Sequence, residues 1–149
     1  MIELAVDDLH LTYGDNPVLK GVSMNLKRGE VVSLLGPSGS GKTTLLRAVA
    51  GLEKPTQGSI VIGNNKVYDG TTRSEVPAEE RNLGLVFQSY ALWPHKTVFE
   101  NVAYPLKLRK VPAKEIQQRV QDVLDQLGLG HLGKRHPHQL SGGQQQRVA

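Results

Sequence analysis

Residues 36–43 combine glycine, lysine and threonine at a spacing suited to holding phosphate groups. They read Gly36-Pro37-Ser38-Gly39-Ser40-Gly41-Lys42-Thr43 and fit the pattern G-x-x-x-x-G-K-[ST]. Glycines let consecutive backbone N–H groups turn toward phosphate oxygens, and a helix beginning near Lys42 would direct its positive end to the same place. We predict that the Lys42 ammonium contacts the β- and γ-phosphates of a nucleotide and that the Thr43 hydroxyl binds Mg²⁺.

A chance glycine-rich turn is the alternative for this loop. The apolar run Val31–Leu35 precedes it and a helical pattern follows it, which is the strand, loop and helix order that a phosphate-binding loop requires. Later in the chain, Ser141, Gly142 and Gly143 stand at a predicted helix start, where N–H groups and a hydroxyl would form a second anion site. A flexible turn before a helix is the alternative there.

The elements that would position these groups begin with a small antiparallel sheet. Apolar residues alternate with polar or small ones, the period of half-buried strands, at residues 2–6, 9–13 and 22–26. Turn signals lie at residues 14–17 and 27–30. The run Val31–Leu35 is unbroken, so we predict a strand buried on both faces.

The pattern after the loop predicts an α/β architecture. Leu45, Leu46 and Val49 give the next helix an apolar side, and Gly51 is placed to end it in a left-handed conformation. Residues 59–62 and 83–87 are predicted to form two further strands.

The second half of the chain is predicted to be helical. Thr97 and Glu100 form a capping box, and Pro112 opens another helix. Gly128 is the predicted stop of that second helix, whose apolar residues recur at helical spacing: Ile116, Val120, Val123, Leu124 and Leu127. We therefore expect a β-subdomain and phosphate-binding core at residues 1–88 and a helical subdomain at 89–149.

Composition excludes several classes of protein. The 149 residues carry 18 Lys and Arg against 14 Asp and Glu, a net charge of +4 without a basic block, so we expect no nucleic-acid partner. No cysteine is present, which excludes a disulfide scaffold and agrees with a reducing compartment. The first residues are unlike a signal peptide, and no apolar run is long enough to cross a bilayer. We expect a cytoplasmic protein whose membrane link comes from a partner.

These motifs together resemble the nucleotide-binding subunit of ATP-binding cassette (ABC) transporters. The resemblance covers all 149 residues and rests on four motifs in order: Tyr13, the loop at 36–43, Gln88 and the signature Leu140-Ser141-Gly142-Gly143-Gln144. It implies an α/β P-loop NTPase core with an N-terminal antiparallel β-subdomain, a helical subdomain and an incomplete central sheet. The segment 81–95 most resembles bacterial importers for ferric iron, polyamines and sugars, with ferric iron as the expected solute.

The resemblance also implies roles for individual residues. Tyr13 would stack on adenine, with core packing of its ring as the alternative, and Gln88 would contact Mg²⁺ and the attacking water, with a simple strand end as the alternative. Lys42 and Gln88 are thus the implied catalytic residues, and Thr43 and Gln88 the Mg²⁺ ligands. The implied ATP-binding residues are Tyr13, Gly36, Pro37, Ser38, Gly39, Ser40, Gly41, Lys42, Thr43, Thr44, Ser141, Gly142, Gly143 and Gln144.

The implied assembly places the subunit on the cytoplasmic face of the cell membrane. The signature of one subunit would close over ATP held by a second subunit in a head-to-tail dimer, and a periplasmic solute-binding protein would act indirectly. Tyr90, Leu92, Trp93 and Pro94 resemble the surface that docks on the transmembrane permease subunits, with core packing as the alternative. His136 and His138 flank Pro137, but no ligand cluster accompanies them, so we expect a surface loop.

Hydrolysis needs a carboxylate to orient water, and the family supplies it after the signature. Asp122, Asp125 and the pair Asp7-Asp8 lie on predicted elements that do not suit this role, so no general base is assigned. We therefore expect an incomplete ABC ATPase that binds nucleotide poorly and does not hydrolyse it. The rival hypotheses are a P-loop GTPase, which Asn65-Lys66-Val67-Tyr68 disfavours because the guanine-reading Asp is absent, a soluble ABC ATPase outside transport, and a non-enzymatic interaction fragment.

Overall fold

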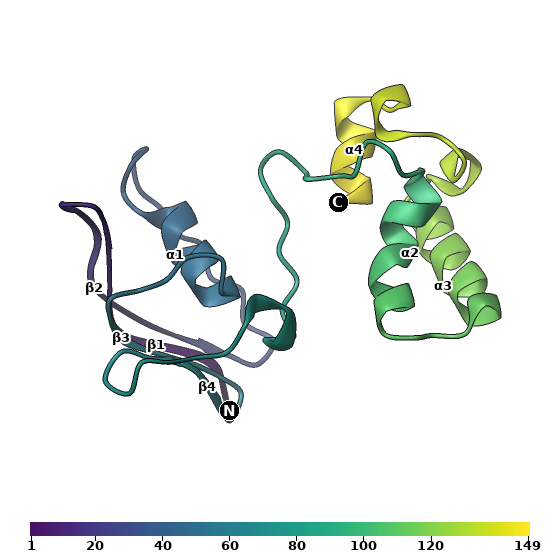
Figure 1. The fold of residues 1–149 in the computed structure, drawn as a ribbon. Coiled ribbons are helices and arrows are strands. Elements are labelled where there is room, and N and C mark those ends of the chain that lie inside the picture. The colour runs from purple at the N-terminus through teal and green to yellow at the C-terminus, as the bar shows by residue number, and fades with distance from the viewer. The chain divides into compact units, whose positions relative to one another are not determined.

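The structure is a computed structural model that describes residues 1–149. The chain forms two compact units, Met1–Leu85 and Val86–Ala149. The first unit contains a five-stranded sheet and one α-helix, and the second unit is helical (Figure 1). None of the helices is long and apolar enough to cross a membrane.

The sheet of the first unit is antiparallel throughout, with the strand order β2-β1-β3-β4-β5. Its strands are β1 (Ile2–Tyr13), β2 (Asn16–Lys27), β3 (Gln57–Ile62), β4 (Asn65–Asp69) and β5 (Ser74–Glu75). The helix α1 (Lys42–Ala50) packs on this sheet, and a short 3-10 turn follows at Ala78–Glu80. The predicted antiparallel sheet and the helix after the loop are therefore confirmed.

The two alternating runs at 2–6 and 9–13 form one strand, β1, interrupted by a β-bulge. Val6 pairs with Met24 and Leu9 with Val22, so the register shifts between them, and Asp8 adopts a φ of 44°. The bulge brings the β1 backbone close to Gly58, where a Cβ would lie 2.6 Å from the Asp7 carbonyl oxygen. One extra residue keeps both apolar runs on the same face of the sheet.

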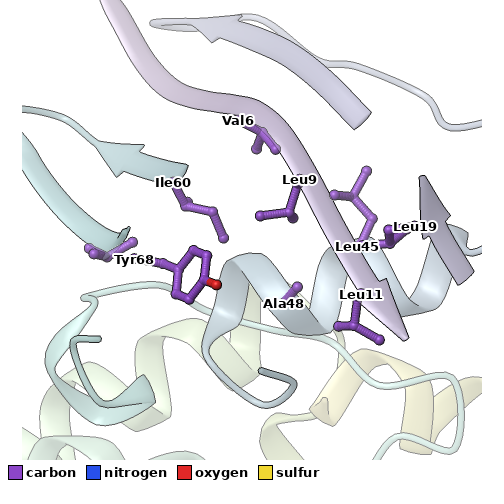
Figure 2. Packing of buried hydrophobic residues seen from close by; sticks show 9 residues of the cluster. Val6, Leu9, Leu11, Leu19, Leu45, Ala48, Ile60 and Tyr68 are labelled. Carbon is purple, nitrogen blue, oxygen red and sulfur yellow. The ribbon is translucent and has the colours of Figure 1, made fainter. Parts of the chain in front are cut away.

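The core of the first unit lies between that face and α1. Figure 2 shows side chains of β1 packing toward Leu45 and Ala48 of the helix. Ala48 is fully buried whereas Leu46 is 51% exposed, so the prediction that Leu46 lies on the buried side is wrong. The buried cluster comprises Val6, Leu9, Leu11, Leu19, Leu45, Ala48, Ile60, Val67 and Tyr68.

Two predicted strands are absent from the structure. Residues 31–35 and 83–87 form neither a helix nor a strand. Val31 and Leu35 are 92% and 93% exposed, and only Leu34 of that run packs against the core. A strand needs a neighbour for its backbone N–H and C=O groups, and the five strands present pair only with one another. An apolar run predicts burial but does not supply a pairing partner.

The second unit contains three α-helices, α2 (Val98–Leu108), α3 (Ala113–Gln126) and α4 (Gly142–Val148), and 3-10 turns at Gly130–Leu132 and Pro137–Gln139. The predicted capping box is confirmed: Glu100 N–H donates to Thr97 Oγ1 at 3.2 Å, and Thr97 N–H to Glu100 Oε2 at 2.8 Å. Gly128 follows α3 with a φ of 70°, as expected for a helix stop. The buried core comprises Val98, Ala103, Ile116, Val120, Leu124, Leu129, Leu132 and Leu140.

Candidate functional site

The loop at 36–43 leads directly into the N-terminus of α1. Gly41 is the residue before the helix, with a φ of 92°, and no side chain caps this end. The first N–H groups of a helix have no acceptor within the helix, so those of α1 are available to an outside anion. The helix dipole adds partial positive charge at this end.

The Lys42 ammonium is held by the loop itself. Its Nζ atom donates to the carbonyl oxygens of Gly36 and Pro37 at 2.6 and 2.8 Å and to Ser40 Oγ at 3.1 Å. None of the five ion pairs of the chain involves Lys42. The ammonium charge is therefore anchored by neutral oxygens and is not neutralised by a carboxylate.

An added Cβ would be crowded at two glycines of the loop. A Cβ at Gly36 would lie 2.7 Å from Ser40 Oγ. At Gly41 the φ is positive, and a Cβ would lie 3.0 Å from Leu19 Cδ2 and 3.2 Å from the Val18 carbonyl oxygen. The Thr43 side chain is exposed on the first turn of α1. The loop is thus a backbone cradle with one fixed cation and one free hydroxyl, a set of groups that fits a phosphate chain with its Mg²⁺ ion.

Tyr13 lies at the tip of the β1–β2 hairpin, opposite Asn16. Its side chain is 45% exposed, so the core-packing alternative for this ring is wrong. Farther down the same hairpin, Leu11 pairs with Leu19, whose side chain lies against Gly41. The hairpin therefore packs at the base of the phosphate-binding loop, and its end presents an exposed aromatic ring that is free to stack.

Gln88 belongs to the second unit and lies in a turn, where Tyr90 N–H donates to the Phe87 carbonyl at 3.0 Å. Its side chain is exposed. The strand that was expected to end at Gln88 is absent, so the alternative of a simple strand end is wrong as well. Tyr90 and Ala91 follow with φ values of 65° and 52°, left-handed conformations that bend the chain before Leu92.

Asn101 of α2 holds the segment that follows this bend. Its Oδ1 accepts from Trp93 N–H at 2.9 Å, and its Nδ2 donates to the carbonyls of Trp93, Lys96 and Thr97 at 3.2, 3.2 and 2.9 Å. The amide is buried and binds four backbone groups at once. The loop before α2 therefore has a fixed conformation although its outer side chains are exposed.

Trp93, Tyr104 and Lys96 form an aromatic platform on this loop. The Trp93 and Tyr104 ring centroids are 4.5 Å apart, and Lys96 Nζ lies 5.9 and 5.2 Å from them. Trp93 and Pro94 are exposed, whereas Tyr90 and Leu92 are half-buried. The two rings are tilted by 58°, so the platform offers an angled aromatic surface edged by a positive charge.

Ser141 begins α4 with a second capping box. Gln144 N–H donates to Ser141 Oγ at 3.2 Å, and Ser141 N–H donates to Gln144 Oε1 at 2.9 Å. The Gln144 side-chain oxygen is therefore engaged by the Ser141 N–H. The Ser141 hydroxyl accepts in this capping box, so its proton can still be donated to an acceptor outside the motif. Open space surrounds Gly142 and Gly143, where a Cβ would meet no atom within 4 Å. Another molecule can approach the backbone closely at these two residues.

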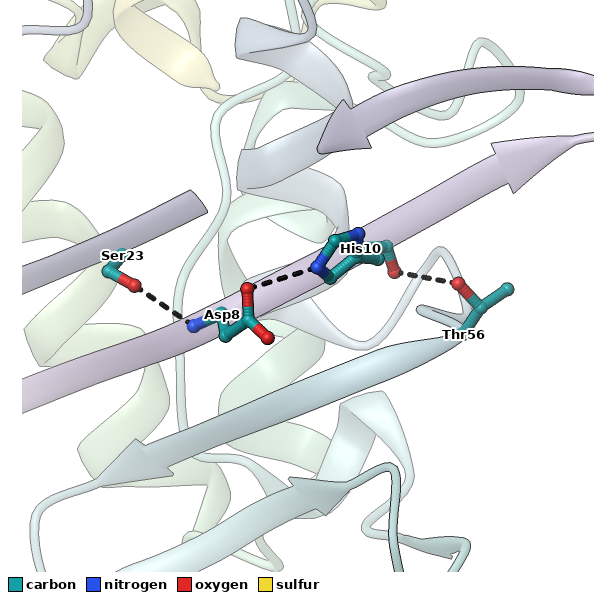
Figure 3. A network of polar contacts seen from close by, with 4 residues as sticks. All are labelled: Asp8, His10, Ser23 and Thr56. Atoms are coloured by element: carbon teal, nitrogen blue, oxygen red, sulfur yellow. Dashed lines mark hydrogen bonds and ion pairs between the residues drawn. The ribbon is translucent and has the colours of Figure 1, made fainter. Parts of the chain in front are cut away.

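Three of the four acidic residues considered as a general base have structural partners. Asp122 and Asp125 accept from Gln118 Nε2 at 2.8 Å and Gln121 Nε2 at 2.9 Å, one helical turn away on α3. Figure 3 shows Asp8 at the bulge, where its N–H donates to Ser23 Oγ and its carboxylate lies 3.0 Å from His10 Nε2. The rings of His136 and His138 stack with centroids 5.9 Å apart, and no group of three or more potential metal-binding side chains occurs.

Sequence reasoning missed the two polar side chains that the structure buries, Arg81 and Asn101. Asn101 was detectable, because it stands three residues after Val98 on the apolar side of a predicted helix. Arg81 carried no such signal, since it follows a short 3-10 turn and precedes a segment without regular secondary structure.

Comparisons with known proteins agree with this geometry. A profile of the ABC transporter family matches residues 19–149. The chain is 52% identical over 142 residues to the trehalose/maltose import ATP-binding protein MalK of Thermococcus litoralis, covering 95% of this chain and 38% of that protein. It is 50% identical over 137 residues to the Fe(3+) ions import ATP-binding protein FbpC of Photobacterium profundum, covering 92% of this chain and 37% of that protein.

Among solved structures, the chain superimposes with a TM-score of 0.83 and 36% identity on a dimeric, post-hydrolysis state of the ATP-binding cassette MJ0796 bound to ADP and Pi. That alignment covers 97% of this chain and 66% of the other. The chain thus spans about 38% of the length of the curated relatives it matches.

Proposed function

This chain belongs to the ABC transporter family, and we propose that it is the ATP-binding part of an importer subunit. One observation carries the proposal: the loop at 36–43 forms a glycine cradle around an unneutralised Lys42 ammonium at the uncapped N-terminus of α1. Such an arrangement favours a chain of phosphates, because the backbone N–H groups, the helix dipole and the ammonium act on the same anion.

The proposed nucleotide is ATP with Mg²⁺. The N–H groups of the loop and Lys42 would bind the phosphates, Thr43 and Gln88 would bind the metal, and Tyr13 would stack on the adenine. The side chains of Tyr13, Thr43 and Gln88 are exposed, which supports these roles because a ligand can reach each of them. Mg²⁺ would supply charge neutralisation of the phosphates.

A second ATP-binding subunit is proposed as the partner at the signature. Ser141, Gly142 and Gly143 would close over the nucleotide of that subunit, and the open space around both glycines supports a close backbone approach. The dimeric state of the solved relative, bound to ADP and Pi, supports the same assembly.

The proposed membrane partner is a pair of permease subunits, docked on the segment Tyr90, Leu92, Trp93 and Pro94 at the cytoplasmic face of the membrane. The aromatic platform beside it supports this role, because an exposed aromatic surface with a fixed backbone is typical of binding hot spots. Ferric iron, delivered by a periplasmic binding protein, is the proposed solute, and the identity to the FbpC relative supports it. The MalK name of the other relative makes a disaccharide the first alternative to test by uptake assays.

Calorimetry with Mg·ATP tests the nucleotide proposal. We expect the wild-type chain to bind, and Lys42→Ala to bind more weakly by roughly ten- to hundredfold, since a hydrogen bond to a charged group contributes about 1.5–3 kcal/mol. Lys107→Ala removes an equal charge from an exposed position on α2 and should leave binding unchanged. Equal binding by Lys42→Ala and the wild type would contradict the proposed site. We also expect no ATP turnover above the Lys42→Ala background, because no carboxylate is assigned as the base that orients the attacking water.

A further inference from the structure

Arg81 is the single charged side chain among the buried residues, with 3% of its surface exposed. Its Nε atom donates to the Val76 carbonyl at 2.8 Å. One terminal nitrogen donates to the carbonyls of Ala48 and Val49, both at 3.0 Å, and the other to Val67 at 3.4 Å. All four acceptors are neutral backbone oxygens, so the guanidinium joins pieces of backbone and has no carboxylate as its direct partner.

The acceptors lie on three different parts of the first unit. Ala48 and Val49 are at the C-terminal end of α1, where the dipole is negative and the last carbonyls have no N–H donor in a following turn of helix, although the Ala48 carbonyl also accepts from Gly51 N–H at 3.1 Å. Val67 is on β4, and Val76 directly follows β5. A single side chain thus fixes the end of α1 against the sheet.

Gly51 leaves the space that the Arg81 guanidinium occupies. A Cβ at Gly51 would lie 2.8 Å from Arg81 Nε and 3.0 Å from its Cζ, so only glycine leaves room at that position. Burial lowers the pKa of Arg81, and the nearby negative charge of Glu75 opposes this shift. The side chain stays charged, because arginine titrates far above neutral pH.

The opposite end of α1 carries Lys42 and Thr43. The helix has nine residues and therefore spans only about 13 Å. A short helix moves as a rigid rod, so a shift or tilt at Ala48 and Val49 is transmitted to its first turn. The position of the phosphate-binding N–H groups depends on what fixes the far end.

We propose that Arg81 is a positioning residue of the nucleotide site, which holds α1 so that its first turn faces the phosphates. This inference rests on the proposed ATP-binding function. It assigns Arg81 a role through α1 and no contact with the nucleotide.

Two substitutions separate the parts of this role. Arg81→Lys keeps the charge but cannot span four carbonyls, and Arg81→Met keeps the apolar stem without the charge. Arg47→Met is the matched control, because Arg47 is an exposed arginine in the last turn of the same helix. Thermal unfolding of each full 149-residue chain gives the folded fraction at the assay temperature. Calorimetry then gives the Kd of the folded fraction for Mg·ATP.

We expect both Arg81 variants to weaken the Kd of the folded fraction about tenfold or more. We also expect the backbone amide NMR signals of Gly41, Lys42 and Thr43 to move in the nucleotide-free Arg81 variants. Arg47→Met should change neither quantity. If Arg81→Met does not fold, Arg81→Lys carries the test, since it retains the charge and the apolar stem and loses only the spread of the guanidinium over several carbonyls.

Arg81 variants that lose only thermal stability, with an unchanged Kd of the folded fraction and unmoved signals at Gly41–Thr43, would overturn the inference. Failure of the wild type to bind Mg·ATP would instead contradict the proposed function. The two failures are distinguishable, because the amide signals report the position of the first turn without any nucleotide.

Discussion

Replacing Gly41 by alanine tests the shape of the phosphate-binding loop without changing its charge. Gly41 has a φ of 92°, a conformation that costs an L-residue roughly 1–2 kcal/mol. The added Cβ would also lie 3.0 Å from Leu19 Cδ2 and 3.2 Å from the Val18 carbonyl oxygen. Overpacking of this kind costs roughly 1–3 kcal/mol. We expect Gly41→Ala to lower the free energy of unfolding of the first unit by about 2–5 kcal/mol.

Gly39→Ala is the matched control for this substitution. Gly39 has a φ of 81°, but a Cβ there would meet nothing within 4 Å. Only the backbone cost of roughly 1–2 kcal/mol should appear. Amide hydrogen exchange of β1 and β3 measures the stability of the first unit, and calorimetry measures Mg·ATP binding. Equal stability and equal affinity of the two variants would refute the argument that β2 limits the space at Gly41.

Three further predictions concern other parts of the site. Asn101→Ala removes four hydrogen bonds and should destabilise the second unit by roughly 2–4 kcal/mol in urea unfolding. Tyr13→Ala should weaken the Kd for ATP by about 5- to 150-fold, since base stacking contributes about 1–3 kcal/mol, whereas Tyr13→Phe should retain it. The hydrogen bond from Thr97 N–H lowers the pKa of Glu100 below its usual 4.5. The ionised Glu100 carboxylate therefore stabilises α2 above pH 4.5. This stabilisation should be lost as the pH falls through the lowered pKa of Glu100 in the folded chain, and circular dichroism would follow the loss of helix.

Each of these expectations has an outcome that counts against it. If the Asn101→Ala variant unfolds at the same urea concentration as the wild type, water must satisfy the backbone groups that the Asn101 amide binds. Equal affinities of Tyr13→Ala and Tyr13→Phe would exclude stacking. In the Glu100→Gln variant, the stability of α2 should no longer depend on acid pH. If the dependence is still seen in that variant, another carboxylate causes it.

The local signals in the sequence were sufficient for helices and caps. Thr97 with Glu100, Pro112 and Gly128 mark helix ends by hydrogen bonds and conformations that involve only neighbouring residues, and the structure confirms each. The alternation of β1 reported burial correctly for Val6, Leu9 and Leu11, whereas Ile2 and Tyr13 at the two ends of the strand are exposed.

The long-range features could not be obtained from the same signals. Val31–Leu35 has the composition of a buried strand, yet strand formation depends on a neighbour that no local pattern specifies. Arg81 binds carbonyls from α1, β4 and the segment after β5, a combination that only the fold brings together. The sequence predicted the phosphate-binding loop and the helix α1 that follows it. It did not predict the hydrogen bonds from Arg81 that fix the end of α1.

The bulge at Asp8 decides which way Tyr13 faces. Side chains alternate along a strand, so removing one residue between Val6 and Leu9 would exchange inside and outside for everything beyond it. Leu9 and Leu11, which are buried against α1, would turn to solvent, and Tyr13 would change face with them. A single extra residue thereby sets the facing of the whole second half of β1, and deleting Asp8 should destabilise the first unit in urea unfolding.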